Sequence, residues 1–152
     1  MPTSSNEKRA ALYADLNRAV RLFIAGSSLY SQRVAEKLRL HPTDLQFLNM
    51  LELMGPLTPK ALGRYSGLSS GGVTVVLDRL EKGGYLRRKP NPADGRSFLV
   101  DFSPARRRKV TAHYTAVEQQ FTALLMGTPT EELEIVAGFF AKMNAARPAE
   151  AD

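Results

Sequence analysis

The stretch LSSGGVTVVLDRL, residues 68–80, combines the apolar spacing of an amphipathic helix with two adjacent glycines near its start. At about 100° per residue, one side of this helix is apolar and lies within roughly 60° of its first valine. The residues of this predicted buried face are Val73, Val76, Leu77 and Leu80. The predicted outward residues are Gly71, Thr74, Val75, Asp78, Arg79 and Lys82. Helix propensity disfavours Gly71 and Gly72 here, so we expect that another constraint placed them in the helix.

The residues before this stretch predict a shorter helix. Thr58 followed by Pro59 is a helix-start signal, a hydroxyl N-cap with proline at the first helical position. Gly67 is expected to end that helix as a left-handed C-cap residue, and Ser69 is the N-cap candidate of the next helix. A short helix, a turn with glycine and an amphipathic helix form a helix-turn-helix, whose second helix can lie in the DNA major groove.

A β-hairpin is predicted directly after the helix-turn-helix. Two short strand-like segments, residues 85–89 and 97–102, flank the sequence PNPADGR, residues 90–96. The second segment has the alternation of a half-buried strand, and the linker is rich in turn-forming residues. The hairpin would therefore be the wing of a winged helix.

Long helices are predicted on both sides of this region. Residues 7–39 contain no proline and carry apolar side chains three or four positions apart, and residues 43–54 form a second helix. Ser103 and Pro104 open a helix with an apolar stripe that continues to Leu124. A last helix covers residues 129–145, and the tail RPAEAD, residues 147–152, is expected to fray. One chain of this size can hardly cover such stripes, which predicts dimerisation through the two ends of the chain.

The predicted fold class is mainly α with a small β-hairpin wing, a winged helix-turn-helix domain flanked by long N- and C-terminal dimerisation helices. Residues 1–42 are assigned to the N-terminal dimerisation helix and residues 43–103 to the DNA-binding winged helix-turn-helix. Residues 104–152 are assigned to the C-terminal dimerisation helices and tail. The parts would form one intertwined domain per chain, because 152 residues fit one compact domain better than two.

The net charge of +6 is unevenly distributed along the chain. Residues 57–110 hold twelve Lys or Arg and four Asp or Glu, a net charge of +8. The remainder holds nine bases and eleven acids, a net charge of −2. A continuous basic third of the chain favours a surface for a polyanion such as nucleic acid. The alternative is a solvated basic face without a partner.

Composition argues against several other classes of protein. The chain has no cysteine, which excludes disulfides, thiolate zinc sites, cysteine nucleophiles and thiol redox sensing. No run of about 18 apolar residues could span a bilayer, and residues 1–10 lack the apolar core of a signal peptide. A cytoplasmic protein with no membrane partner is therefore expected. The sequence contains no HExxH, P-loop or Cys-based zinc pattern, so no metal site and no cofactor is expected.

These features together resemble the MarR family of winged-helix transcription regulators. The family's recognition-helix pattern is a serine or similar N-cap, a Val-Thr pair and an Asp-Arg-Leu-Glu run that ends in glycine. It is matched by Ser69, Val73, Thr74, Asp78, Arg79, Leu80, Glu81 and Gly83. The wing pattern, Asp-x-Arg before an alternating strand and a helix start, is matched by Asp94, Arg96, Val100, Phe102 and Ser103. The likeness covers nearly the whole chain, because long terminal helices also flank the winged helix in the family.

The resemblance implies a homodimeric transcription regulator, and not an enzyme, that binds a pseudo-palindromic site in double-stranded DNA. Each recognition helix would enter a major groove, and Arg96 of each wing would reach an adjacent minor groove. Asp94 would hold the wing tip by accepting N–H groups of Arg96 or of the turn backbone. The resemblance further implies a repressor that a small-molecule effector releases from DNA. Candidate lining residues for that effector, taken from where the first two helices meet, are Tyr30, His41 and Phe47.

The predicted DNA-contacting residues form three groups. Those of the recognition helix are Ser69, Ser70, Gly71, Gly72, Thr74, Val75 and Arg79. Those of the wing are Arg87, Arg88, Lys89, Asp94 and Arg96. Phosphate contacts are further expected from Lys60, Arg64 and Lys82. The basic run at residues 106–109 is interpreted either as a DNA backbone contact or as a solvated face.

Two of these positions depart from the family pattern. Many members carry Arg where this chain has Val75, and the common second wing residue, also Arg, is Gly95 here. The family's sequence specificity is therefore not expected to carry over, although its docking mode is. A Val75 methyl can contact a thymine C5-methyl, and the Thr74 hydroxyl can reach a base edge or a phosphate.

Parts of the sequence are also compatible with two other functions. Residues 67–71 match the G-x-S-x-G pattern of a hydrolase nucleophile elbow with Ser69 as nucleophile, and His113 lies downstream. That motif requires a strand directly before the serine, whereas a helix and a turn are predicted there. The other alternative is a winged helix that binds protein and not DNA, which the basic hairpin disfavours.

Overall fold

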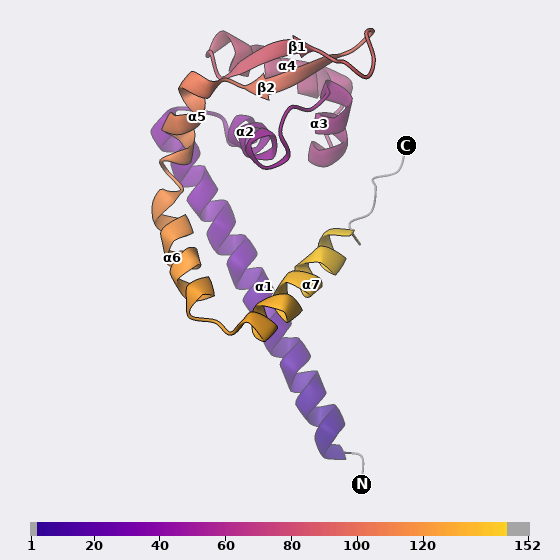
Figure 1. Ribbon diagram of the computed structural model, residues 1–152, viewed down its shortest axis with the longest axis vertical. Coiled ribbons are helices and arrows are strands. Elements are labelled where there is room, and N and C mark those ends of the chain that lie inside the picture. Colours follow the sequence, from indigo (N-terminus) through magenta and orange to yellow (C-terminus); the bar gives the residue numbers. More distant parts are fainter. Residues whose placement is uncertain (1–2, 146–152) are drawn as a thin grey trace. The chain divides into compact units, whose positions relative to one another are not determined.

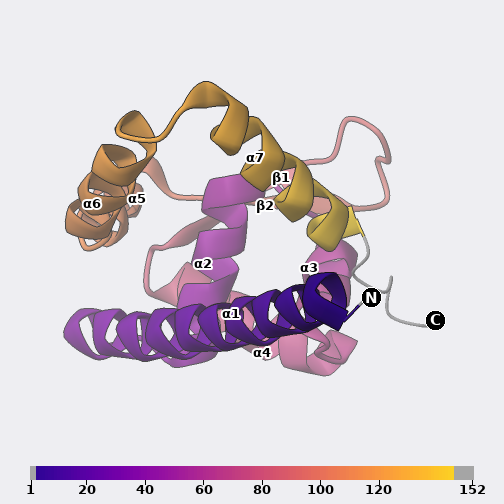
Figure 2. The same cartoon turned by 90° about the horizontal axis from the view of Figure 1, so that it is seen from below.

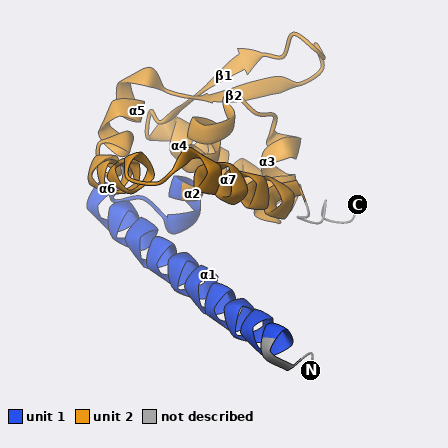
Figure 3. Cartoon of the chain, turned by 60° about the horizontal axis from the view of Figure 1, so that its bottom comes forward, with its two compact units in different colours: residues 1–45 blue, residues 46–152 orange. Residues whose placement is uncertain are grey.

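The computed structural model describes residues 3–145, so the predicted frayed tail lies outside the described residues. The chain divides into two compact units, Met1–Leu45 and Gln46–Asp152 (Figure 3). The elements along the chain are α1 (Thr3–Leu38), α2 (Pro42–Met54), α3 (Pro59–Ser66), α4 (Ser70–Lys82), β1 (Leu86–Pro90), β2 (Phe98–Phe102), α5 (Pro104–Thr111), α6 (Thr115–Met126) and α7 (Thr130–Ala145) (Figure 1). The predicted fold class, mainly α with a β-hairpin wing, is confirmed. The division into DNA-binding and dimerisation regions stays a prediction.

Local signals set the boundaries of α3 and α4. The Thr58 side chain accepts a hydrogen bond from the backbone N–H of Ala61 at 3.1 Å, and proline occupies the first helical position. Gly67 ends α3 in the left-handed conformation, with φ of 68°, which a residue with a side chain adopts only with strain. The Ser69 side chain then accepts a hydrogen bond from the Gly72 N–H at 3.3 Å. The predicted caps of the helix-turn-helix are thus confirmed.

The core of the second unit forms around α4. The predicted buried face of α4 is confirmed, because its four residues, Val73, Val76, Leu77 and Leu80, are all buried. Helix α4 packs against α3 and β1, and α3 packs against β2. Figure 1 shows α3 and α4 beside the hairpin, and Figure 2 shows the same elements from below. Further buried side chains come from α2, α3, the hairpin and α5: Phe47, Leu48, Leu51, Leu62, Tyr85, Leu86, Val100, Phe102 and Val110. The outward face of α4 and the wing therefore belong to one packed body.

The strands β1 and β2 pair antiparallel, with Leu86 opposite Phe102 and Pro90 opposite Phe98. Leu57, between α2 and α3, extends this hairpin by an isolated bridge to Val100. Two reciprocal backbone hydrogen bonds form the bridge, with N–O distances of 3.1 and 2.8 Å. The bridge ties the start of the helix-turn-helix to the base of the wing, and the sequence pattern gave no signal for it.

The predicted helix from residue 104 to Leu124 is corrected, because the structure divides it into α5 and α6. The N–H groups of His113 and Tyr114 donate to carbonyls three residues earlier, which interrupts the α-helical ladder. The sequence from Val110 to Thr115 is rich in β-branched and aromatic residues of low helix propensity. In addition, the Tyr114 hydroxyl accepts a hydrogen bond from the Asn49 amide at 3.1 Å, a contact with α2 that sequence periodicity does not reveal.

The start of α5 needs a smaller correction. Ser103 holds the N-cap position before Pro104, as predicted, but its side chain makes no capping hydrogen bond. Its backbone N–H instead donates to the Tyr85 carbonyl at 2.8 Å. Ser103 therefore joins the end of β2 to the start of the hairpin.

Large apolar side chains remain exposed on the helices outside the winged helix. No residue of α6 or of α7 is buried within the described chain. In the first unit, α1 exposes Leu16, Phe23 and Ile24, and in the second unit Phe121 and Phe139 are more than half exposed. Over residues 3–145, no helix has the length and apolar character needed to cross a membrane.

Candidate nucleic-acid interface

The outward face of α4 is exposed as predicted. Its residues are Gly71, Thr74, Val75, Asp78, Arg79 and Lys82, and all six fall in the exposed class. The side chain of Val75 is notable because it is apolar and 55% exposed. Burial in this chain therefore does not account for the choice of valine at this position.

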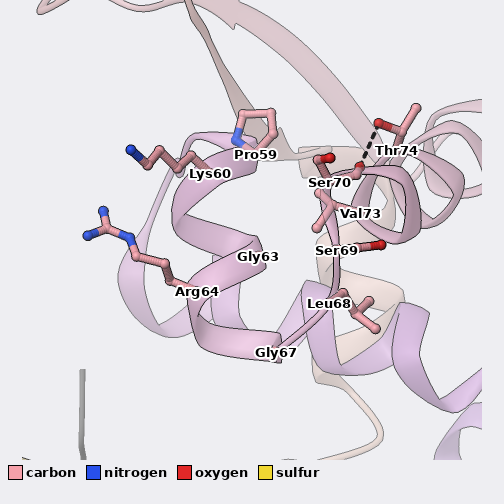
Figure 4. Close-up of a pocket in the computed structure, with 10 residues that line it drawn as sticks. All are labelled: Pro59, Lys60, Gly63, Arg64, Gly67, Leu68, Ser69, Ser70, Val73 and Thr74. Atoms are coloured by element: carbon pink, nitrogen blue, oxygen red, sulfur yellow. Dashed lines mark hydrogen bonds between the residues drawn. The ribbon is translucent and has the colours of Figure 1, made fainter. Parts of the chain in front are cut away.

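Two hydroxyl groups at the start of α4 already have partners within the helix. Ser69 caps the helix through Gly72, and the Thr74 hydroxyl donates to the Ser70 carbonyl at 3.0 Å (Figure 4). The hydroxyl of Thr74 therefore points back along the helix and not outward. Ser70 itself is exposed at the first position of α4.

The two glycines of the first turn of α4 have no conformational or packing reason within the chain. Neither has a positive φ, since the glycines with positive φ are Gly55, Gly67 and Gly84. A Cβ built at Gly71 would meet nothing within 4 Å, and one at Gly72 would approach its neighbours no closer than 3.5 Å, an ordinary contact. The fold would therefore accept alanine at both positions.

A shallow pocket of about 560 Å³ lies between α3 and the start of α4 (Figure 4). Figure 4 shows Lys60 and Arg64 extending from α3 in the same direction, on the side away from Ser70 and Thr74. The two helices approach closely at Gly63, where an added Cβ would lie 3.4 Å from both the Leu68 carbonyl oxygen and a Val73 methyl. Gly63 thus lies at the contact between the two helices, a position that sequence reasoning missed.

The wing tip, residues 91–97, is held by hydrogen bonds within the turn. An Asp94 carboxylate oxygen accepts the backbone N–H of Arg96 at 3.0 Å, as the sequence predicted. The Ser97 N–H donates to the Asp94 carbonyl at 3.1 Å, and the Asn91 amide donates to the Ser97 hydroxyl at 2.8 Å. These bonds fix the backbone from which the exposed Arg96 side chain projects.

Arg88 of β1 connects the wing to α4. Its guanidinium lies 3.1 Å from an Asp78 carboxylate oxygen and 2.9 Å from a Glu81 carboxylate oxygen, both on α4. It also lies over the Phe98 ring, 4.8 Å from the centroid. Arg88 therefore links the hairpin to α4, and its phosphate contact stays a prediction.

Asp101 of β2 gathers cations at the base of the wing. Its carboxylate pairs with Lys89. It also pairs with the Arg87 guanidinium at 3.2 Å, and a guanidinium nitrogen of Arg107 in α5 lies 3.8 Å from a carboxylate oxygen. Arg107 also pairs with Glu52 of α2 at 3.0 Å, so the cluster joins four elements, β1, β2, α5 and α2. Sequence reasoning assigned Arg87 and Lys89 to DNA and missed this cluster. The only signal for it was one acid within the apolar segment FLVDF.

The environment of Asp101 keeps it ionised. Burial raises the pKa of Asp101, but hydrogen bonds from Lys89 and Arg87, together with their positive charges, lower it more. The pKa of Asp101 therefore lies below its ordinary value. The ion pairs at the base of the wing are accordingly present at neutral pH.

The remaining predicted phosphate contacts, Lys60, Arg64 and Lys82, are exposed side chains of α3 and α4. In the basic run of α5, Arg106 lies over the Tyr85 ring at 5.2 Å and Arg107 over the Phe102 ring at 5.6 Å. Arg108 and Lys109 are exposed. The run therefore divides into two residues that pack on the hairpin and two that face solvent.

The predicted effector-lining residues differ in burial. Tyr30 is half-buried and His41 is exposed, both in the first unit, whereas Phe47 is fully buried in the second unit. Phe47 thus occupies a packed core position, and the effector site stays a prediction. Among the described residues, no group of three or more His, Cys, Asp or Glu is placed to hold a metal ion.

The geometry of a hydrolase elbow is not present at Ser69. The residues before it form α3 and a turn that ends at Gly67, where the motif requires a strand. The Ser69 hydroxyl serves as the cap of α4. The G-x-S-x-G match is therefore a coincidence of helix capping and turn chemistry.

Comparisons with known proteins agree with this geometry. A sequence model of the MarR family matches residues 40–97. The uncharacterized HTH-type transcriptional regulator YcgE of Bacillus subtilis is 35% identical over 114 residues, which cover 75% of this chain and 74% of YcgE. The multiple antibiotic resistance protein MarR of Salmonella typhimurium is 36% identical over 62 residues, 41% of this chain and 43% of that protein.

Solved structures show the same fold. Apo MarR from E. coli matches with a TM-score of 0.58 and 21% identity, covering 84% of this chain and 95% of that one. A point mutant of MepR from a multidrug-resistant clinical isolate of S. aureus matches with a TM-score of 0.68 and 17% identity, covering 88% and 96%. At such identities the likeness concerns the fold alone.

Proposed function

The chain belongs to the MarR family of transcriptional regulators, and we propose that it is a homodimeric repressor that binds a pseudo-palindromic site in double-stranded DNA. The observation that carries this proposal is that one packed body presents both an outward helix face on α4 and a wing tip with an exposed arginine. Each α4 enters a major groove, and each wing places Arg96 in an adjacent minor groove.

The charge of the winged helix supports binding to a polyanion. Residues 57–110 carry a net charge of +8, but Arg87, Arg88, Lys89 and Arg107 are engaged in ion pairs within the chain. Lys60, Arg64, Lys82 and Arg96 are exposed cations of the helix-turn-helix and wing tip outside these ion pairs, and Arg79 of α4 is exposed as well. Four phosphate or minor-groove contacts in each protomer of a dimer correspond to a slope of about −7 in a plot of log affinity against log salt.

The exposed apolar helices support a dimer. α1, α6 and α7 expose large apolar side chains that a single chain leaves in contact with water, which favours burial against a second copy. A twofold dimer presents two recognition helices, so it requires two half-sites about 10 base pairs apart, centre to centre, or a multiple of that spacing. Repression follows because the bound dimer blocks access to the promoter.

An effector that releases the repressor completes the proposal. It derives from the family resemblance, with Tyr30, His41 and Phe47 as the candidate lining. The burial of Phe47 means that such a ligand reaches this side chain only if the surrounding core opens.

The test is selection of bound fragments from genomic DNA, followed by footprinting on the enriched sequences. The expected result is one enriched motif with two protected half-sites at the stated spacing, and a dimer by light scattering. Affinity should fall steeply between low and moderate salt. No enriched motif together with salt-independent or absent DNA binding would instead favour a winged helix that binds protein.

A further inference from the structure

The reading face of α4 presents methyl groups where it approaches DNA. Its outward positions in the first two turns are Ser70, Gly71, Thr74 and Val75. Gly71 has no side chain, and the Thr74 hydroxyl is donated to the Ser70 carbonyl, which leaves the Thr74 methyl as its outer group (Figure 4). Val75 adds two methyls one position further. The centre of this face therefore offers apolar contact and no side-chain hydrogen-bond donor beyond Ser70.

Stability within the chain does not explain Val75. Its side chain is 55% exposed, and a β-branched residue is less favourable in a helix than alanine. Its stiffness is useful for recognition, because one side-chain rotamer dominates for valine in a helix and its two methyls then hold fixed positions. Gly71 lies one turn earlier on the same face, where an added Cβ would meet nothing within 4 Å, so the backbone beside Val75 is open to close approach.

The next outward residue of α4, Asp78, is charged and pairs with the wing. Asp78, four positions after Thr74, is paired with Arg88 of the wing at 3.1 Å. That pair neutralises the one carboxylate among the six outward residues of α4, so it does not repel the DNA backbone near the methyl surface.

We propose that Val75 and Thr74 determine sequence specificity by packing their methyl groups against the C5-methyl of thymine in the major groove of each half-site. The inference rests on the proposed DNA-binding function. In the major groove, thymine is distinguished from the other three bases by its methyl group, and apolar contact with that methyl is an established form of base readout. Replacing thymine by uracil removes the methyl and leaves every Watson–Crick hydrogen bond in place.

Burial of one methyl group corresponds to about a fourfold change in affinity. The effects at two symmetric half-sites multiply. Removing the contacted methyl from both half-sites therefore corresponds to a loss of about 15-fold in affinity. Changes of this size are well within the resolution of a binding titration.

The probe is the tightest duplex obtained by in vitro selection with the wild-type dimer. It is synthesised again with deoxyuridine replacing one thymidine of each half-site at a time, and each duplex is titrated by fluorescence anisotropy. One or two positions should lose about 15-fold in affinity when both half-sites are changed. At such a position, a 5-methylcytosine–guanine pair should bind more tightly than a cytosine–guanine pair, because it restores the methyl.

Variants identify the residues that make the contact. Val75→Ala should bind the thymine and uracil duplexes with affinities within about a factor of two of each other, because the valine methyls that contact the thymine C5-methyl are gone. Thr74→Val, which keeps the methyl, should retain the discrimination at its position, and Thr74→Ser, which keeps the hydroxyl, should lose it. Lys82→Ala is the matched control: it should weaken binding to both duplexes by the same factor, because a phosphate contact does not read the base.

The outcomes separate this inference from the proposed function. If the selected duplex binds tightly but no thymine position responds to uracil, or if Val75→Ala responds as the wild type does, methyl readout is wrong while DNA binding stands. If Thr74→Ser discriminates and Thr74→Val does not, the threonine hydroxyl reads the base and the assignment of its methyl is wrong. If selection enriches no sequence, the proposed function itself fails.

Discussion

The outward face of α4 and the β1–β2 hairpin differ in the number of charged side chains that they carry. The centre of the α4 face, at Gly71, Thr74 and Val75, carries no charge, whereas β1 carries three consecutive cations. Those cations, however, are paired within the chain, with Asp101 or with carboxylates of α4. Arg96, at the tip of the wing, is exposed and lies outside these ion pairs. The net charge of a segment therefore does not tell which of its cations are available to DNA.

The first prediction concerns the anchor of the hairpin. Asp101→Asn should lower the free energy of unfolding by about 2 to 3 kcal/mol, because it removes a buried carboxylate and leaves its cations uncompensated. The figure is at the lower end for a buried pair, because Arg87 and Lys89 remain partly exposed. Urea unfolding at fixed protein concentration measures it. Asp15→Asn, an exposed site on α1 with the same change of charge, is the control and should stay within about 0.5 kcal/mol of the wild type.

The pH dependence of Asp101 follows from the direction of its pKa shift. Its pKa in the folded chain is lowered, so ionised Asp101 stabilises the fold fully above the unfolded pKa of about 3.9. That contribution is lost as the pH falls through the folded pKa. The difference between the wild type and Asp101→Asn should therefore be largest near neutral pH and shrink below about pH 4. A difference that stays constant into acid would show that the carboxylate charge is not what anchors the hairpin.

The second prediction concerns the wing tip. Arg96→Ala should weaken binding to the selected duplex by about 2 kcal/mol and leave the dimer and its thermal unfolding unchanged, because Arg96 is exposed and the turn is held by Asp94. Arg96→Lys should recover part of the loss, since it keeps the charge but not the planar guanidinium. Equal affinity of Arg96→Ala and wild type at moderate salt would show that the wing tip does not contact DNA.

The third prediction tests whether Arg88 joins the two regions. Arg88→Ala should lower the free energy of unfolding by about 1 kcal/mol, the sum expected for partly exposed ion pairs and one contact with an aromatic ring. A double-mutant cycle with Asp78→Ala measures the coupling between wing and helix. The coupling should decrease in high salt, because both side chains are exposed to solvent. Zero coupling at low salt would mean that the wing and α4 are held together by their apolar core alone.

Sequence periodicity predicted the parts of the fold that depend on neighbours along the chain. The buried side of α4, the Thr58 and Ser69 caps and the hairpin follow from side-chain spacing, capping chemistry and turn residues within a few positions. Within the candidate site, the same reasoning predicted that Asp94 would hold the wing tip and that Val75 would face outward. These features are local, and the structure confirms them.

The features that sequence analysis missed depend on residues far apart in the chain. The division of the helix at residues 112–114 accompanies a hydrogen bond between Asn49 and Tyr114, which are 65 positions apart. The Leu57–Val100 bridge and the Asp101 cluster likewise join separate elements. A count of basic residues could not show that Arg87 and Lys89 face Asp101, because that pairing depends on the register of the hairpin.

Gly71 of α4 is expected to serve DNA binding and not folding. Gly71→Ala should raise the free energy of unfolding by about 0.5 kcal/mol, because alanine is the better helix former and the added methyl meets no atom of the chain. Binding to the selected duplex should nevertheless weaken, and Gly71→Leu should weaken it further, because a side chain here separates the helix from the bases. Gly138→Ala in α7 is the control for helix propensity, since its Cβ also meets nothing within 4 Å of the chain; with the dimer verified by light scattering, it should give a similar gain in stability without the loss of affinity. Opposite effects on folding and binding at Gly71 would show that DNA, and not the fold, requires the glycine. If Gly71→Ala binds as tightly as the wild type, close approach of the backbone to DNA is not needed. The uncharged α4 face would then differ from the basic hairpin only through the methyl groups of Thr74 and Val75.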